Sequence, residues 1–451
     1  MGYAPPAYRA PTPAGETTRV DVERFWGAGR DDGPTTAPER STATSRTRTA
    51  TAAPPPRTGT APGAVRPDGP VADRPAQRPR FRLGHRPALD GLRGVAIVIV
   101  VIYHMGVVLT PEADSWLLLP GGFLGVDLFF ALSGFLITTL LLGELGDTGR
   151  IDMLGFARRR GRRLVPALAG LLVVAAIVAA TTEMYVLHEV AITSVWSLTF
   201  TVNWAVPHNV PVAIGHLWSL AIEVQFYLLW SAVMTVVALL VPVRRIRAVL
   251  AVIALAGIAA VALNRALAIG RGENFFFLYL GTFDRLDAPL VGALAGLAVG
   301  SGWVSRMSRR TATLLSLLGL SGLLAGAMVL RYSDAVLYEG LFTVLAVCAA
   351  LTVLGAVAHD GTWLARVLGS PPLVGVGAWS YSLYLWHLPV FEALARWTPG
   401  YLGSFRAAMG LVTSGVIAWL SYQCVERPFL SRRRSASGAV RDRGPVGSAT
   451  G

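Results

Sequence analysis

The feature that most constrains this chain is a series of apolar runs of about 20 residues each, which begins near Gly91 and continues almost to the C-terminal end. A helix of that length crosses the roughly 30 Å hydrocarbon core of a bilayer. Hydrophobic residues make up 53% of the chain and charged residues only 15%, which excludes a soluble globular protein and a largely disordered one. The sequence therefore predicts an all-α fold, a polytopic membrane bundle of about ten transmembrane helices. The predicted spans are 91–110, 122–142, 164–182, 217–241, 246–268, 283–302, 313–330, 336–357, 373–394 and 404–424.

Both ends of the chain differ from this middle part. Residues 1–82 are rich in Pro, Ala, Thr and Arg and carry too few apolar side chains to form a core, so we expect a disordered tail. This tail has no apolar stretch of the kind found in secretory signals, and we expect it to remain in the cytoplasm. Residues 83–430 form the predicted membrane domain, and residues 431–451 a second short, disordered cytoplasmic tail.

The arginines predict the orientation of the spans. All 40 basic residues are arginine, and the formal net charge is +13. Short loops that carry positive charge stay in the cytoplasm. If both termini are cytoplasmic and 191–206 is re-entrant or interfacial, the inner side from Arg82 to Arg434 holds 20 arginines and the outer side about five. This bias explains the basic charge without nucleic-acid binding, and it predicts a multi-pass protein of the cell membrane. The five outer arginines are Arg265, Arg271, Arg331, Arg396 and Arg406.

Several predicted spans contain ionisable residues at similar depth toward the outer side. A charge in hydrocarbon is costly unless it is paired or hydrated, so such residues are candidates for function. They predict a shared polar cavity, and Glu223 is the hardest of them to explain by packing. Arg285 and Asp287 do not face each other on a helix, so we expect them to pair with other spans, in a structural or a catalytic role. The candidates are His104, Asp127, Glu223, Arg285, Asp287 and His387, with His216 close to the outer end of its span.

Arg93 and His104 are predicted to lie on one face of the first span. Eleven residues at 100° each bring the second side chain to within about 20° of the first, roughly 16 Å along the axis. A basic group at the inner end can bind an anionic donor, and an imidazole deeper in the membrane can act as a general base. The alternative is an arginine that anchors the helix at the interface and a buried polar histidine.

The loop FARRRGRRLVP carries five arginines at the predicted inner face. Arginine binds phosphate through two parallel hydrogen bonds, which would suit coenzyme A or a nucleotide. The same run would also arise as a topology determinant or as an anchor for anionic lipid. The two cysteines, Cys348 and Cys424, lack metal-ligand spacing, so no metal site is expected.

From about Arg86 to Leu430 the chain resembles the acyltransferase-3 family of integral membrane O-acyltransferases. The resemblance rests on seven strings in order. These are RPALDGLRGVAIVIVVIYHMG with its Arg93/His104 pair, GGFLGVDLFFALSGFLI, RRGRRLVP, HLWSLAIEVQFYLLW, RLDAPLVGAL, SYSLYLWHLPV and ERPF. No segment resembling the SGNH hydrolase-like domain of some members follows Leu430, so the resemblance implies a stand-alone transferase.

The resemblance implies acyl transfer from acyl-CoA, with acetyl-CoA as the default, to a hydroxyl of a carbohydrate or glycosylated acceptor such as a surface glycan or an antibiotic sugar. Arg93 and His104 match the family's functional pair, and Glu223 matches a family carboxylate. We expect His104, oriented by Asp127 or Glu223, to deprotonate the acceptor or to take the acyl group itself. The arginines expected to contact the donor are Arg159, Arg160 and Arg163.

Two other classes of function remain open. The same ionisable residues would form a proton or substrate pathway in a transporter, although no inverted repeat is evident. A scaffold without catalytic activity would leave His104 and Glu223 buried without a purpose.

Overall fold

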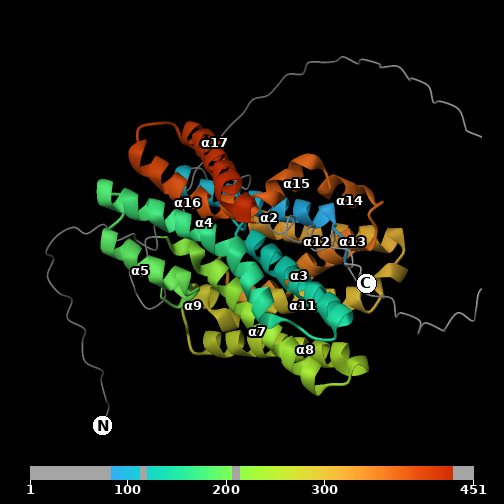
Figure 1. The fold of residues 1–451 in the computed structure, drawn as a ribbon. Helices are drawn as coiled ribbons and strands as arrows, with labels where there is room; N and C mark the ends of the chain where they lie inside the picture. Colours follow the sequence, from blue (N-terminus) through green and yellow to red (C-terminus); the bar gives the residue numbers. More distant parts are fainter. Residues whose placement is uncertain (1–82, 112–118, 206–213, 430–451) are drawn as a thin grey trace, which may run out of the picture.

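The computed structural model describes residues 83–111, 119–205 and 214–429, and within these ranges the chain is helical and contains no strand. Figure 1 shows one bundle of helices. The two tails predicted to be disordered, 1–82 and 431–451, lie outside the described residues, together with the arginines at 432–434.

Eight of the predicted spans correspond to helices that are long and apolar enough to cross a membrane. Two of them include a short turn before the main helix, and the last includes a π-helical turn after it. The eight are α2 (Pro87–Leu109), α3 (Leu124–Thr148), α4 (Met153–Thr181), α7 with its preceding turn (Gly215–Leu240), α8 (Val243–Gly270), α12 (Arg309–Val329), α13 with its preceding turn (Leu337–Ala358) and α17 with its continuation (Gly403–Phe429).

The other two predicted spans take a different form. Span 283–302 is a short helix, α10 (Thr282–Arg285), followed by the 14-residue helix α11 (Asp287–Gly300). Span 373–394 was predicted as one helix, and this prediction is wrong. The chain forms α15 (Pro371–Ala378) and α16 (Ser380–Trp397), separated at Trp379.

Before this break, α15 packs closely against α2. A Cβ atom on Gly377 would lie 1.8 Å from the carbonyl oxygen of Asp90, so only glycine allows the two backbones to approach so closely. After the break α16 runs beside α2. The first residue of α16, Ser380, therefore lies beside Arg93 on α2.

Segment 191–206 does not form a continuous helix long enough to span. It contains α5 (Leu187–Leu198), whose 12 residues extend roughly 18 Å, and α6 (Val202–Ala205). Phe200 between them has φ 55°. Side chains fix this turn to neighbouring helices, because Asn203 donates to Thr282 Oγ1 over 2.9 Å and Gln225 donates to the Phe200 carbonyl over 2.7 Å.

The α2 helix (blue in Figure 1) packs against α3, α15 and α16, which places its polar residues inside the bundle. The α3 helix in turn packs tightly on α11 through small residues. A Cβ atom on Gly134 would lie 1.8 Å from the Pro289 carbonyl oxygen, and one on Gly292 would lie 2.0 Å from that of Ala131. This contact brings the acidic residues at the starts of α3 and α11 close together.

Candidate active site

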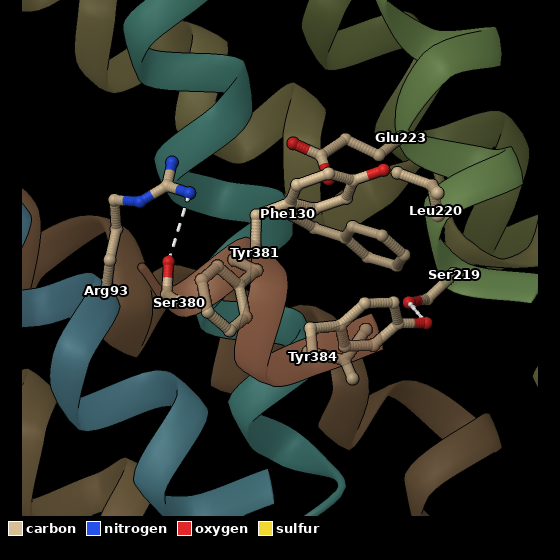
Figure 2. A pocket seen from close by; sticks show the side chains of 10 residues that line it. Arg93, Phe130, Ser219, Leu220, Glu223, Ser380, Tyr381 and Tyr384 are labelled. Atoms are coloured by element: carbon tan, nitrogen blue, oxygen red, sulfur yellow. Dashed lines mark hydrogen bonds between the residues drawn. The ribbon is translucent and has the colours of Figure 1, made fainter. Parts of the chain in front are cut away.

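A cavity lies between α2, α3, α7 and α16, and charged and hydroxyl side chains line it together with apolar ones. In Figure 2, Arg93 on α2 and Glu223 on α7 approach from opposite sides with their charged ends toward one another. Of the ionisable residues from which the sequence predicted a shared polar cavity, Glu223 lines this one, and Arg93, predicted at the inner end of its helix, lines it as well. The lining residues are Arg93, Val126, Phe129, Phe130, Ser219, Leu220, Glu223, Ser380, Tyr381 and Tyr384.

Arg93 contacts the start of α16. Its guanidinium donates a hydrogen bond to Ser380 Oγ over 3.2 Å and lies 5.8 Å from the centre of the Phe129 ring. No salt bridge to Arg93 is found within the described ranges. A guanidinium that faces a cavity without a paired carboxylate retains donors that can bind an anionic ligand.

Glu223 is held by two hydroxyl groups. Ser133 Oγ and the Tyr227 hydroxyl both donate to its carboxylate. The hydroxyl oxygens of Ser133 and Tyr227 are 3.0 Å apart. The guanidinium of Arg160 lies 5.1 Å from the centre of the Tyr227 ring. Ser133 thus orients a carboxylate of the cavity.

The other end of the α2 face carries a pair of histidines. His104 Nδ1 lies 3.0 Å from the Val100 carbonyl oxygen and 3.3 Å from His387 Nε2. Both rings are buried, and the ring centres are 5.0 Å apart. Because Arg93 and His104 both contact α16, the structure confirms that the two side chains share one face of α2.

A third histidine, His216, lies beside this pair at the start of α7. The ring centres of His216 and His387 are 5.6 Å apart. The Tyr384 hydroxyl donates to the His216 carbonyl oxygen and lies 2.9 Å from Ser219 Oγ. Tyr384 thus lines the cavity and also contacts the histidine cluster, which connects the two ends of the site.

The sequence predicted that Asp127 or Glu223 orients His104, but in the structure these two carboxylates bind other residues. Asp127 binds Arg285 through both oxygens at 2.9 Å, and Glu223 binds Ser133 and Tyr227. Among the side chains that the structure describes, His387 contacts His104 Nδ1 through its Nε2. The sequence contained His387 but gave no sign of which helix it would face.

Asp127, Arg285 and Asp287 belong to two buried ion pairs. Asp287 accepts a hydrogen bond from Arg265 over 2.7 Å, and the Arg285 guanidinium lies 3.8 Å from the centre of the Phe342 ring. The expectation that Arg285 and Asp287 pair with other helices is confirmed. Arg265, counted from the sequence among the outer arginines, lies near the end of α8, and its side chain is fully buried.

The arginines at the start of α4 separate into two faces. Arg158 and Arg162 are exposed, whereas the three residues expected to contact the donor are partly buried. Arg159 pairs with Glu144 over 3.1 Å, and Arg160 lies over the Tyr227 ring beside Glu223. Arg163 lies within electrostatic range of Arg93.

One buried carboxylate was not identified as a site residue from the sequence. Glu426 is 3% exposed, accepts a hydrogen bond from Ser382, and lies within electrostatic range of Arg93 and Arg163. It ends a π-helical turn, Tyr422–Glu426, a feature common at functional sites. The ERPF string was the available signal, but its sequence position did not show that it reaches α16.

Comparison with curated proteins finds O-acetyltransferases that are similar in sequence to this chain. O-acetyltransferase OatA of Staphylococcus aureus (strain NCTC 8325) is 31% identical over 355 residues, which cover 76% of this chain and 57% of OatA. Two putative O-acetyltransferases of the same species, SAS0844 (strain MSSA476) and SAR0937 (strain MRSA252), are each 30% identical over 366 residues, 77% of this chain and 58% of theirs. The chain thus spans just over half the length of these curated relatives. No solved structure matches it significantly.

A family model described as an acyltransferase domain matches residues 86–423. This range contains α2, the cavity and all three clustered histidines. Since the match covers well over half of the sequence, the chain belongs to the acyltransferase-3 family.

Proposed function

We propose that the protein is a membrane O-acyltransferase that moves an acyl group, with acetyl as the default, from cytoplasmic acyl-CoA to a hydroxyl of a carbohydrate or glycosylated acceptor. The printed names of the relatives support O-acetyl transfer. The observation that carries the proposal is the shared face of α2, on which Arg93 borders a cavity and His104 lies about 16 Å further along the axis.

The residues at the Arg93 end suit an anionic donor. Arg93, Arg160 and Arg163 lie around the same end of the cavity as Glu223. Guanidinium groups bind phosphate oxygens through charge-assisted hydrogen bonds, and the donor supplies the acyl group as a thioester. We therefore assign donor binding to these arginines.

His104 is the general base in this proposal. Its Nε2 accepts the proton of the acceptor hydroxyl while the hydroxyl oxygen forms a bond to the acyl carbon. The carbon–sulfur bond then breaks, and the proton passes from His104 to the departing sulfur. General-base catalysis contributes about 10²–10⁴-fold, and the remaining acceleration comes from positioning in a cavity shielded from water.

The same proposal fixes an orientation. The arginine excess of the predicted inner loops supports a protein of the plasma membrane with both termini in the cytoplasm. Arg93 then lies toward the cytoplasm, where the donor is made, and the histidines lie toward the outside. An acceptor hydroxyl on the extracytoplasmic side would approach His104 from that end.

Mass spectrometry of surface glycans and secreted glycosides tests this function. Cells would carry the wild-type protein or His104→Ala at equal expression. We expect one acyl group to be missing from a specific glycan or glycoside in the variant, and its mass would identify both the acyl chain and the acceptor. Identical covalent profiles with a changed distribution of a solute would favour a transporter and contradict the proposal.

A further inference from the structure

The hydrogen bonds of His387 fix which of its nitrogens carries the proton. Its Nδ1 lies 3.0 Å from the Leu383 carbonyl oxygen and 2.8 Å from that of Tyr384. Both oxygens can only accept, so Nδ1 must be the donor. A neutral imidazole has one N–H group, and the other nitrogen, Nε2, therefore carries the lone pair.

The state of His104 follows from that of His387. His104 Nδ1 faces two acceptors, the Val100 carbonyl oxygen at 3.0 Å and His387 Nε2 at 3.3 Å. Its proton must therefore reside on Nδ1, because a lone pair there would meet two other lone pairs. In the neutral ring this leaves Nε2 of His104 as the basic nitrogen, the one that the proposed reaction uses.

We propose that His387 is the positioning residue for the catalytic base and takes the place that a carboxylate holds in a Ser-His-Asp triad. It accepts a hydrogen bond from the Nδ1–H group of His104, fixes the tautomer and turns Nε2 toward the substrate. When Nε2 takes the acceptor's proton, His104 becomes a cation, and its hydrogen bond to His387 becomes charge-assisted. This inference rests on the proposed function.

A neutral acceptor suits this location better than a carboxylate. His387 is fully buried, and aromatic rings surround it, with ring-centre distances of 5.9 Å to Phe391 and 6.0 Å to Tyr384. An ionised carboxylate there would need a charged partner, as Asp127 needs Arg285. An imidazole avoids that cost and still orients its neighbour.

The test compares two amides at position 387. In His387→Gln the amide oxygen can reach the former place of Nε2 and accept from His104. In His387→Asn the side chain is one methylene shorter, so its amide can occupy the place of Nδ1 but cannot reach His104. Purified wild-type and variant proteins would be assayed in detergent with acetyl-CoA and the acceptor found by mass spectrometry, and their melting temperatures compared.

We expect His387→Asn to lower kcat by about 10²-fold or more, with the KM for acetyl-CoA unchanged. His387→Gln should recover at least tenfold of that loss. Wild-type kcat in folded His387→Asn would overturn the inference, as would equal losses in both variants. If His104→Ala were instead fully active, the proposed function would fail first, so the two failures can be told apart.

The tautomer can be measured separately in a protein labelled with ¹⁵N-histidine. The His104 signals are assigned by their loss in His104→Ala. Solid-state NMR at neutral pH should show a protonated Nδ1 and an unprotonated Nε2 for both His104 and His387. The opposite tautomer at either residue would contradict the inference even if the activities agreed.

Discussion

Two groups of ionisable residues lie inside this bundle, and they differ in how their charges are satisfied. In the first group, between α3, α8 and α11, each charge has a buried partner of opposite sign, Arg285 for Asp127 and Arg265 for Asp287. In the second, between α2, α7 and α16, hydroxyls and imidazoles provide the contacts. Arg93 binds Ser380, and His104 binds His387.

This difference separates structural from functional roles. A closed ion pair neutralises its own charge and offers little to a ligand, whereas removal of one partner leaves an uncompensated charge in the interior. Residues held by neutral groups beside a cavity keep donors and acceptors for a substrate. We therefore assign chemistry to the α2, α7 and α16 group and assign to the ion pairs the task of holding α3, α8 and α11 together.

The largest expected effect is on activity. His104→Ala should lower acyl transfer by about 10²–10⁴-fold, because the general base is removed, while the melting temperature stays close to that of the wild type. The assay is release of coenzyme A thiol in the presence of acceptor. His85→Ala is the matched control, since His85 is exposed and pairs with the half-buried Asp90. Comparable rates in the two variants would remove His104 from the mechanism.

Next comes an effect on stability. Asp127→Leu should lower the free energy of unfolding by about 3–5 kcal/mol, because Arg285 is left buried without its counter-charge. The double variant Asp127→Leu/Arg285→Leu should regain most of this loss and remain active. Thermal unfolding in detergent measures the stability of both variants, and the acyl-transfer assay measures their activity. A stable but inactive double variant would show that the pair takes part in catalysis and would break the distinction between the two groups.

A smaller effect is expected at the donor end. Arg93→Ala should raise the KM for acetyl-CoA by about tenfold or more, because a charged hydrogen bond contributes roughly 1.5–3 kcal/mol. Arg158→Ala serves as the control, since that side chain is exposed on the other face of α4. Initial rates over a range of acetyl-CoA concentrations give the KM of each variant. The same KM in both variants would argue that Arg93 serves only as an interfacial anchor.

The smallest effect is predicted for Glu223→Gln. The amide oxygen can still accept from Ser133 and Tyr227, so the geometry is kept and only the negative charge is lost. We expect kcat to fall by a few-fold, because the change from a charged to a neutral acceptor costs about 1 kcal/mol. A loss equal to that of His104→Ala under the same assay would show that the charge of Glu223 is as necessary as His104, and would contradict this assignment.

Much of this arrangement follows from features within single helices. The relation between Arg93 and His104 was predictable because both lie on one helix and its period fixes their angle. The eight long spans were predictable from their length and apolar composition. Such properties depend on residues that are close in the sequence.

What the sequence did not predict depends on contacts between distant segments. Ser380 meets Arg93 across 287 positions, and His387 meets His104 across 283, so no local pattern pairs them. The break at Trp379 arises where α15 packs on the backbone of α2. The burial of Arg265 was not predicted, because its partner Asp287 lies on another helix.

The most direct test of the division between the ion pairs and the α2, α7 and α16 group is transfer of a radioactive acetyl group by the purified protein in proteoliposomes. The donor is [1-¹⁴C]acetyl-CoA, and a membrane extract of the expressing cells provides the acceptor. We predict an alkali-labile labelled product with the wild-type protein and with Asp127→Leu/Arg285→Leu, and none above background with His104→Ala. Equal labelling by His104→Ala and the wild type would contradict the assignment of acyl transfer to the histidine site.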